Sequence, residues 1–567
     1  MIEYGVRKYF YVILAAALFL RLLFLLEIPP GIANDEMNLI MNAQSILSTG
    51  KNIPGVVTGI VGSTSGDLSM GIHSEIGSFL LIPFIKVFGF NAVSVKLPFV
   101  IASIGIVIVG FYLTRKIFNE KVALIAMAIL AVNPWLIFFG RTAYESILSS
   151  FFYMLSLLLI LNLKSWRKLF ALFFLIFGFL SYFSAKTLII PVVLVGTLMS
   201  ILLNKSKDIK PLVVLNVSVL LFVAVYSFVL PKTPAGARIG ELSLNQIVQK
   251  VNLKRTMSLD FFLSPLFENK VTEELRVRLA ASLGEFNPDY LFLNGQPESI
   301  PSLSIPDHGF MYLIDFVLVT LGLLFMAKDF PKQLIVFIGL LAITLFPNFL
   351  NMQGTTYSIR TVFLFPILAI VSGVGIYSIK KNYIKYAVLI IYLVSFLNFC
   401  SIYFNRLPIE RSEGWFLSQR VVSRYIFEAT KLNPDEKIIL ITENPKLTFY
   451  KYLFYTANYV NPKEIALTNE NIANKNYIFG NLLVTKDCIS KNEGLIIQSS
   501  SSTCPEIAGK ANIKSINDAG DVYIISSDAV CNSLSRNKYP LIKDVGELNI
   551  EKLSVENFCK NYISDSL

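Results

Sequence analysis

The chain has 567 residues, of which 54% are hydrophobic and only 16% are charged, and its mean hydropathy is +0.60. Soluble proteins carry about 25% charged residues, so this deficit excludes an ordinary soluble globular protein. The net charge of +11 arises in the first 404 residues, where 31 basic residues face 20 acidic ones, because residues 405–567 carry 19 of each. Membrane proteins collect basic residues in short loops on one side, whereas nucleic-acid-binding proteins spread them along a face. The composition predicts a polytopic membrane protein with a polar C-terminal domain and no nucleic-acid partner.

Eleven apolar runs have about the length of a membrane-spanning helix, and the resulting fold class is a mainly α membrane bundle. The first run follows Arg7 and Lys8 and has no clear small-residue cleavage site after it, so we expect a retained helix rather than a removed signal peptide. The runs cover residues 9–28, 97–114, 122–139, 148–163, 168–184, 187–203, 211–230, 309–326, 333–349, 361–378 and 384–404.

A further apolar stretch, 76–92, decides the predicted topology. Pro83 and Lys86 interrupt it, and if it does not cross the membrane, the basic loops fall on the side of the N-terminus. The positive-inside rule then places the N-terminus in the cytoplasm. We therefore expect an interfacial or re-entrant segment, a transmembrane domain 1–404 with long outer loops 29–96 and 231–308, and an extracytoplasmic domain 405–567. The expected location is the plasma membrane.

The C-terminal domain has the pattern of a small α/β domain. Helical periodicity near 416–431 and 445–457 alternates with the strand-like runs EKIILIT, GLIIQ and DVYIIS. Its four cysteines suggest two disulfides in an external domain, most simply Cys488–Cys504 and Cys531–Cys559, although three pairings are possible and free buried thiols are the alternative. No cysteine spacing resembles a zinc site, and two histidines are too few for an imidazole cluster, so we expect no metal and no cofactor.

The first outer loop places Asp35 and Glu36 directly before a helix with apolar positions Ile40, Ala43 and Leu47. That periodicity predicts a helix lying on the membrane surface. Capping of this helix by Asn34 or Asp35 explains the acidic residues without any chemistry. The alternative is that a carboxylate at the boundary of water and lipid acts as a general base.

Other ionisable residues are predicted at the same side of the membrane. Arg141 and Glu145 are four residues apart and share a helical face if that turn is helical, although an exposed ion pair explains them equally. Lys186 and Arg360 stand near the outer ends of spans, where a long side chain can simply reach water. Together these residues predict an outward cleft with cations for a phosphate and carboxylates for proton transfer.

The Asp-Glu pair, the segment ending in FGFN before VKLPF, and the later NPW…R…E resemble membrane glycosyltransferases of the GT-C fold. The similarity is to the family 39-like group, which includes protein O-mannosyltransferases and aminoarabinose transferases. The resemblance implies transfer of a hexosyl or pentosyl unit, with inversion, from a polyprenyl-phosphate carrier to a protein, lipid or polysaccharide acceptor outside the cytoplasm. It assigns Asp35 as the catalytic base, with Glu36 orienting the acceptor, and Arg141 and Glu145 as residues that bind the carrier phosphate or shape the pocket.

One departure from that family concerns the phosphate contact. Aminoarabinose transferases typically carry Lys-Pro-Pro before the interfacial segment, where this chain has GIHSEIG. His73 could replace the lysine, but a lone loop histidine is more often solvated, and Arg360 is the better candidate.

Two other classes of function remain open. A transporter or flippase for a lipid-linked glycan would place ionisable residues near the bilayer midplane, but the middles of spans two to eleven are nearly free of charge. A catalytically inactive membrane-anchored binding protein would explain a C-terminal domain that lacks a catalytic motif. Only the enzyme interpretation makes Asp35 indispensable.

Overall fold

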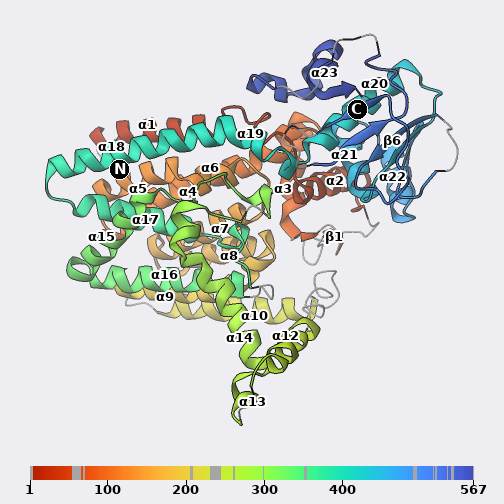
Figure 1. Ribbon diagram of the computed structural model, residues 1–567. Coiled ribbons are helices and arrows are strands. Elements are labelled where there is room, and N and C mark those ends of the chain that lie inside the picture. The colour runs from red at the N-terminus through yellow and green to blue at the C-terminus, as the bar shows by residue number, and fades with distance from the viewer. Residues whose placement is uncertain are drawn as a thin grey trace.

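The computed structural model describes most of the chain, and structural statements below refer to these residues: 4–53, 65–67, 71–73, 75–204, 209–229, 244–259, 262–297, 299–349, 354–489, 494–514, 516, 520–532, 534, 536–537 and 542–565. Long helices form a bundle, and a sheet flanked by short helices lies at one end of it (Figure 1). The N-terminus points toward the opposite end of the bundle. One hydrophobic core runs through both parts.

Each of the eleven predicted apolar runs contains a helix. Of the described helices, five are long and apolar enough to cross a membrane, and a bent pair raises the number to six. The figure of eleven spans stays a prediction. The helices are α1 (Tyr4–Leu22), α4 (Ala92–Ile117), α5 (Glu120–Val132) with α6 (Pro134–Gly140), α7 (Ser146–Asn162), α8 (Phe170–Ser181), α9 (Ile189–Asn204), α10 (Lys210–Val229), α15 (Leu313–Asp329), α16 (Pro331–Phe349), α17 (Leu364–Ser378) and α18 (Asn382–Ser401).

Asparagine caps set where several of these helices begin. The Asn91 side chain accepts hydrogen bonds from the N–H groups of Val93 and Ser94 and so starts α4. Asn133 ends α5 and caps α6 through the Leu136 N–H, and the two helices meet at 54°. The predicted run 122–139 is therefore not one straight helix, because Asn133 restarts the hydrogen-bond ladder in a new direction.

Shorter helices lie at the end of the bundle that carries the sheet. They include α2 (Asn34–Thr49) and α3 (Glu75–Phe88), which pack against each other. A helix of 14 residues such as α3 rises about 21 Å, which is less than the roughly 30 Å hydrocarbon core of a bilayer. Strands β1 (Ser65–Asp67) and β2 (Gly71–His73) pair antiparallel before it.

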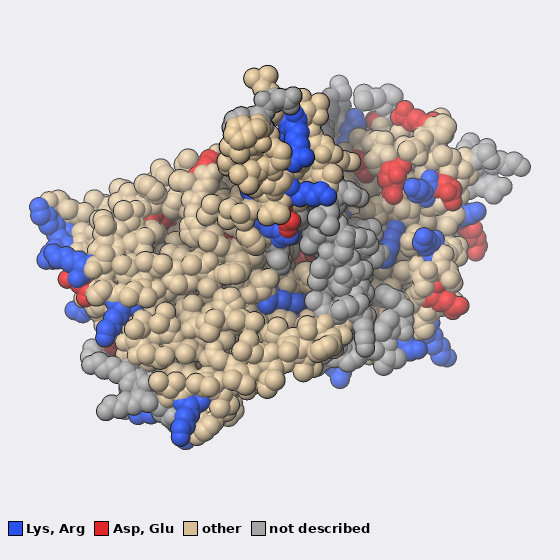
Figure 2. Space-filling model, turned by 90° about the horizontal axis from the view of Figure 1, so that it is seen from below, with Lys and Arg blue, Asp and Glu red and all other residues tan. Residues whose placement is uncertain are grey.

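A helical hairpin projects from the side of the bundle beside α10 (Figure 1). It consists of α12 (Leu244–Thr256), α13 (Ser264–Phe267) and α14 (Lys270–Leu283). Large apolar side chains are unusually accessible here, with Met257 78% and Leu259 93% exposed. Figure 2 shows a wide uncharged belt over the bundle; its end away from the sheet carries mostly Lys and Arg, whereas basic and acidic residues are mixed over the sheet-bearing end.

The C-terminal part forms a mixed sheet with the strand order β4-β5-β3-β6-β8-β7-β9. Strand β3 pairs parallel with β5 and β6, and the outer pairings are antiparallel. The predicted pairings Cys488–Cys504 and Cys531–Cys559 are both confirmed. The strands are β3 (Ile438–Ile441), β4 (Tyr477–Phe479), β5 (Leu482–Thr485), β6 (Leu495–Ser499), β7 (Ala511–Ile513), β8 (Tyr523–Ile525) and β9 (Ile563–Asp565), and the helices are α19 (Leu407–Glu410), α20 (Leu417–Leu432), α21 (Pro445–Tyr455), α22 (Pro462–Ala473) and α23 (Val555–Tyr562).

The predicted elements of this part are confirmed: α20, α21, β3, β6 and β8 lie where the sequence pattern placed them. The helices α21 and α22 of this part pack on α2, and Asn469 Nδ2 of α22 donates to Ser45 Oγ of α2 at 2.9 Å. The division of the chain at residue 404 stays a prediction.

Candidate functional site

The start of α2 is held by the carboxylate of Glu36. Its Oε2 accepts the backbone N–H of Ala33 at 2.7 Å, and its Oε1 accepts the backbone N–H of Ala143. Ala143 lies in the turn between α6 and α7, so this one buried side chain ties the start of α2 to that turn. Burial raises the pKa of Glu36, while the Lys96 ammonium and the two N–H donors oppose that shift.

The predicted cap of α2 is wrong in its details. Ala33 is the N-cap residue, and Asn34 and Asp35 already lie within the helix. The cap function falls to Glu36, which reaches back to Ala33 from the third helical position. Asp35 therefore does not cap the helix, and its side chain is half-buried at the first turn.

Asp35 shares its surroundings with two other predicted site residues. The phenol of Tyr182, between α8 and η2 (Ser184–Leu188), interacts electrostatically with Arg360, Glu145 and Asp35. The phenol of Tyr144 interacts in the same way with Asp35 and Glu36. Asp35, Glu145 and Arg360 therefore all lie within electrostatic range of the Tyr182 hydroxyl, although they come from three segments that are far apart in the sequence. Tyr182 and Tyr144 were missed because a tyrosine near a helix end has no distinctive sequence signal.

Glu145 is buried at the N-terminus of α7, against α3. A Cβ on Gly77 of α3 would lie 2.3 Å from Glu145 Oε1 and 2.7 Å from Leu39 Cδ2 of α2. The absence of a side chain at Gly77 lets the side chains of Glu145 and Leu39 lie directly on the backbone of α3, so α2, α3 and the start of α7 meet closely here.

Lys186 is part of a buried network with Glu75, the first residue of α3. Its Nζ lies 2.7 Å from Glu75 Oε2, and the Tyr226 hydroxyl donates to Glu75 Oε1 at 2.5 Å. The ammonium also lies 4.6 Å from the centre of the Phe179 ring, within range of a cation–π interaction. Glu145 adds an electrostatic interaction with Lys186. Glu75 stands in GIHSEIG, and its position at the start of an apolar helix was the signal that could have marked it.

Arg141 does not turn toward the carboxylates. Its Nη1 donates to the carbonyl of Leu20 at 2.9 Å, and its Nη2 donates to those of Phe24 and Ile28 at 3.0 Å each. Arg141 ends α6 and Glu145 precedes α7, and both are buried. The exposed ion pair is therefore wrong, because the turn between these residues is not helical. Arg141 instead fixes the backbone that leaves α1.

Arg360 lies in η7 (Ser358–Arg360) and is half-buried, with its guanidinium 5.2 Å from the centre of the Tyr357 ring. Within the part of the chain that the structure describes, no carboxylate forms an ion pair with it. His73 ends β2, and its side chain lies outside the described residues. No group of three or more His, Cys, Asp or Glu that could hold a metal ion occurs among the described residues.

The chain is similar to one protein family and to several solved structures. The model of the family described as dolichyl-phosphate-mannose-protein mannosyltransferase matches residues 73–229. The structure of ArnT from Cupriavidus metallidurans bound to undecaprenyl phosphate is 10% identical, with 92% of this chain and 98% of that chain covered and a TM-score of 0.53. The chain has the GT-C glycosyltransferase fold.

The apo structure of ArnT gives the same fold, at 10% identity, with 93% of this chain and 99% of that chain covered and a TM-score of 0.50. The archaeal oligosaccharyltransferase AglB from Archaeoglobus fulgidus is also similar, at 12% identity over 88% of this chain and 69% of that chain, with a TM-score of 0.47. No curated protein matches the sequence. The GT-C resemblance read from the sequence is confirmed, and with its apolar helices the chain is a multi-pass membrane protein.

Proposed function

We propose that the protein is a glycosyltransferase that moves a hexosyl or pentosyl unit from a polyprenyl-phosphate carrier to an acceptor on the extracytoplasmic side, with inversion. The observation that carries the proposal is that Asp35, Glu145 and Arg360 all lie within electrostatic range of the Tyr182 hydroxyl in a chain with the GT-C fold. The ArnT structure that shares this fold is bound to undecaprenyl phosphate, which supports a carrier of that class.

The half-buried carboxylate of Asp35 is the base in this proposal. It takes the proton of an acceptor hydroxyl while the hydroxyl oxygen attacks the anomeric carbon. The bond from that carbon to the phosphate oxygen breaks in the same displacement, so the configuration inverts and the carrier phosphate leaves with the electron pair. Glu145, which lies within electrostatic range of the same Tyr182 hydroxyl as Asp35, contacts the sugar or the acceptor in this proposal.

Arg360 is the cation for the leaving phosphate. Its guanidinium forms no ion pair within the described ranges and so is available to an anion, whereas the charge of Lys186 is balanced by Glu75. A guanidinium offers a bidentate contact to phosphate and stabilises the charge that develops there. Lys186, paired with Glu75, is therefore not assigned to the leaving phosphate, and the proposed reaction uses no metal or cofactor.

The sidedness of the proposal rests on charge. The end of the bundle away from the sheet carries mostly Lys and Arg, whereas both signs of charge are mixed at the sheet-bearing end (Figure 2), and a mainly basic end suits a cytoplasmic face. The candidate site and the C-terminal domain then face outward, in the plasma membrane, where protein, lipid or polysaccharide acceptors are found.

The test is transfer from a panel of polyprenyl-phosphate sugars by the purified protein in lipid. Asp35→Asn is expected to lose at least about 100-fold in turnover, the usual contribution of a general base. Asp435→Asn changes an exposed aspartate in the C-terminal part and is the matched control, expected to retain full turnover. Equal turnover by the native protein and a folded Asp35→Asn variant would refute the assignment of Asp35.

A further inference from the structure

The backbone between α1 and α2, residues 23–33, is held by side chains from distant parts of the chain. We call it the α1–α2 linker. Besides the bonds from Arg141, Lys96 of α4 donates from Nζ to the carbonyls of Leu25 at 2.9 Å and Pro29 at 3.3 Å. Lys96 is buried, so these bonds are shielded from water. The bundle therefore fixes the first half of the linker, up to Pro29.

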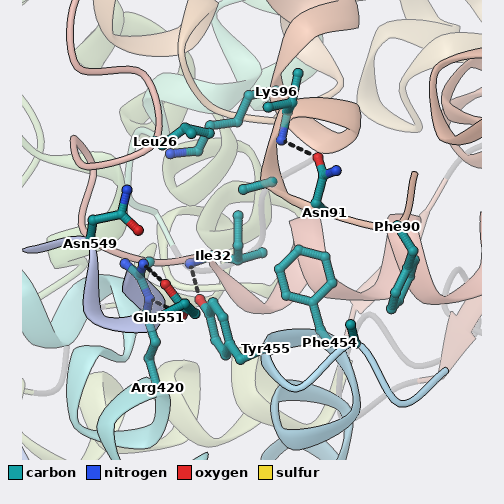
Figure 3. A pocket seen from close by; sticks show the side chains of 14 residues that line it. Leu26, Ile32, Phe90, Asn91, Lys96, Arg420, Phe454, Tyr455, Asn549 and Glu551 are labelled. Atoms are coloured by element: carbon teal, nitrogen blue, oxygen red, sulfur yellow. Dashed lines mark hydrogen bonds and ion pairs between the residues drawn. The ribbon is translucent and has the colours of Figure 1, made fainter. Parts of the chain in front are cut away.

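The second half is held from the C-terminal part. Arg420 of α20 donates from Nη1 to the carbonyl of Pro30 at 2.6 Å, and the Tyr455 hydroxyl of α21 accepts the N–H of Ile32 at 2.9 Å. The remaining nitrogens of Arg420 bind Glu551, with Nε 2.7 Å from Oε1, so the guanidinium is fixed on both sides. Figure 3 shows Arg420, Glu551 and Tyr455 converging on the linker at Ile32.

Gly31 lies between these two bonds and touches the C-terminal part directly. A Cβ at this position would lie 2.1 Å from the carbonyl oxygen of Trp415. Trp415, in η9 (Ser412–Trp415), is fully buried, with its ring 6.4 Å from that of Tyr144 beside the candidate site. The contact at Gly31 is backbone against backbone, so no side-chain rearrangement could make room for a larger residue.

Packing holds this half of the linker closely on one side only. A cavity of about 320 Å³ lies beside it, lined by Leu26, Gly31, Ile32, Phe90, Lys96 and Phe454 among others (Figure 3). A segment with empty space on one side is not held in place by close-packed neighbours. The contact of Gly31 with Trp415 and the hydrogen bonds to Pro30 and Ile32 together hold residues 30–32 on the side away from the cavity.

We propose that Arg420 and Tyr455 are positioning residues for Asp35, so that the C-terminal domain completes the active site. The inference rests on the proposed function for its catalytic consequence. Ile32 precedes Ala33, the residue that Glu36 bonds to begin α2, and Asp35 lies in that first turn. A shift of about 1 Å in a catalytic group can cost about 100-fold in rate. The sheet-bearing domain therefore sets the position of the base rather than contacting the substrate through a motif of its own.

The test compares Arg420→Gln, Arg420→Lys and Tyr455→Phe with the native full-length protein in lipid nanodiscs. Hydrogen–deuterium exchange of a peptide covering residues 31–36 is expected to rise at least tenfold in Tyr455→Phe and Arg420→Gln. Arg420→Lys restores the positive charge and a donor and should recover part of the protection. Lys431→Gln, on the exposed end of α20, is the matched control and should leave the exchange unchanged. Protection of β6 reports that the sheet stays folded in each variant.

Unchanged exchange at residues 31–36 in both Tyr455→Phe and Arg420→Gln would overturn the inference. With an active donor, the same variants are expected to lose turnover without a change in the KM for the donor, and unaltered turnover despite faster exchange would overturn the catalytic role. If the native protein transfers no sugar, the proposed function fails, but the exchange measurement still decides whether the domain fixes the linker. Gly31→Ala provides an independent check, because it should loosen the same peptide without removing any hydrogen-bonding side chain.

Discussion

Replacement of Glu36 by glutamine separates a structural role from a chemical one. The carboxylate accepts two backbone N–H bonds, from Ala33 and from Ala143. Glutamine has one acceptor oxygen, so one of these bonds is lost and the amide NH₂ then faces an N–H group. A hydrogen bond to a charged group contributes about 1.5–3 kcal/mol. Because burial disfavours the charged carboxylate, part of this loss is offset, and we expect a net cost of about 2 kcal/mol.

That cost corresponds to a roughly 30-fold rise in the local opening constant. Hydrogen–deuterium exchange in peptides containing Ala33 and Ala143 measures it, with Asp35→Asn as the matched neighbour that makes neither bond. We expect faster exchange in Glu36→Gln only. Because Glu36 takes no direct part in the reaction, turnover should fall only through the shift of the neighbouring Asp35. Native-like exchange in Glu36→Gln together with abolished transfer would refute this reasoning and return Glu36 to the chemistry.

Three further predictions follow from buried or exposed charges and apolar groups. Lys186→Met leaves Glu75 buried without its cation and should cost about 3–5 kcal/mol, seen as a lower melting temperature, whereas adding Glu75→Gln should recover most of it; no recovery would contradict the pairing. Although burial opposes it, Arg420 lowers the pKa of Glu551, so the stability from this pair is present above the ordinary value of 4.5 and lost as the pH falls through the lowered pKa. Glu551→Gln should therefore reduce the drop in melting temperature below that pH, and equal acid sensitivity would argue against it. The exposed Leu259 of the helical hairpin is expected to contact lipid, in which oxygen is more soluble than a polar nickel chelate. A nitroxide attached at Leu259→Cys should therefore collide with oxygen more often than with the chelate, and the reverse would exclude lipid contact of the hairpin.

The candidate site was only partly accessible to sequence reasoning. Asp35 and Glu36 were singled out by their place after the first apolar run, yet the bond from Glu36 to Ala143, more than a hundred residues away, has no signal in the sequence. Arg141 and Glu145 were paired by spacing, but the non-helical turn between them sends Arg141 to the linker and Glu145 to α3. Side-chain direction at a helix end depends on tertiary contacts, which spacing does not encode.

The sequence by itself predicted the apolar helices and the α/β character of the C-terminal part, and it offered the observed disulfides as the simplest of three possible pairings. The physical reason is that these features are local: long apolar runs, alternating patterns and cysteines 16 and 28 residues apart carry their own signal.

Only the tertiary structure decided which charges meet. Arg420 reaches Pro30 across 390 residues, and Lys186 reaches Glu75 across 111. A buried cation must bind an acceptor, and the packing of the helices decides which acceptor lies within reach. Many different acceptors are compatible with the same composition. The position of the C-terminal domain on the α1–α2 linker has the same origin. It depends on the contact of Gly31 with a distant backbone, and no sequence pattern marks such a contact.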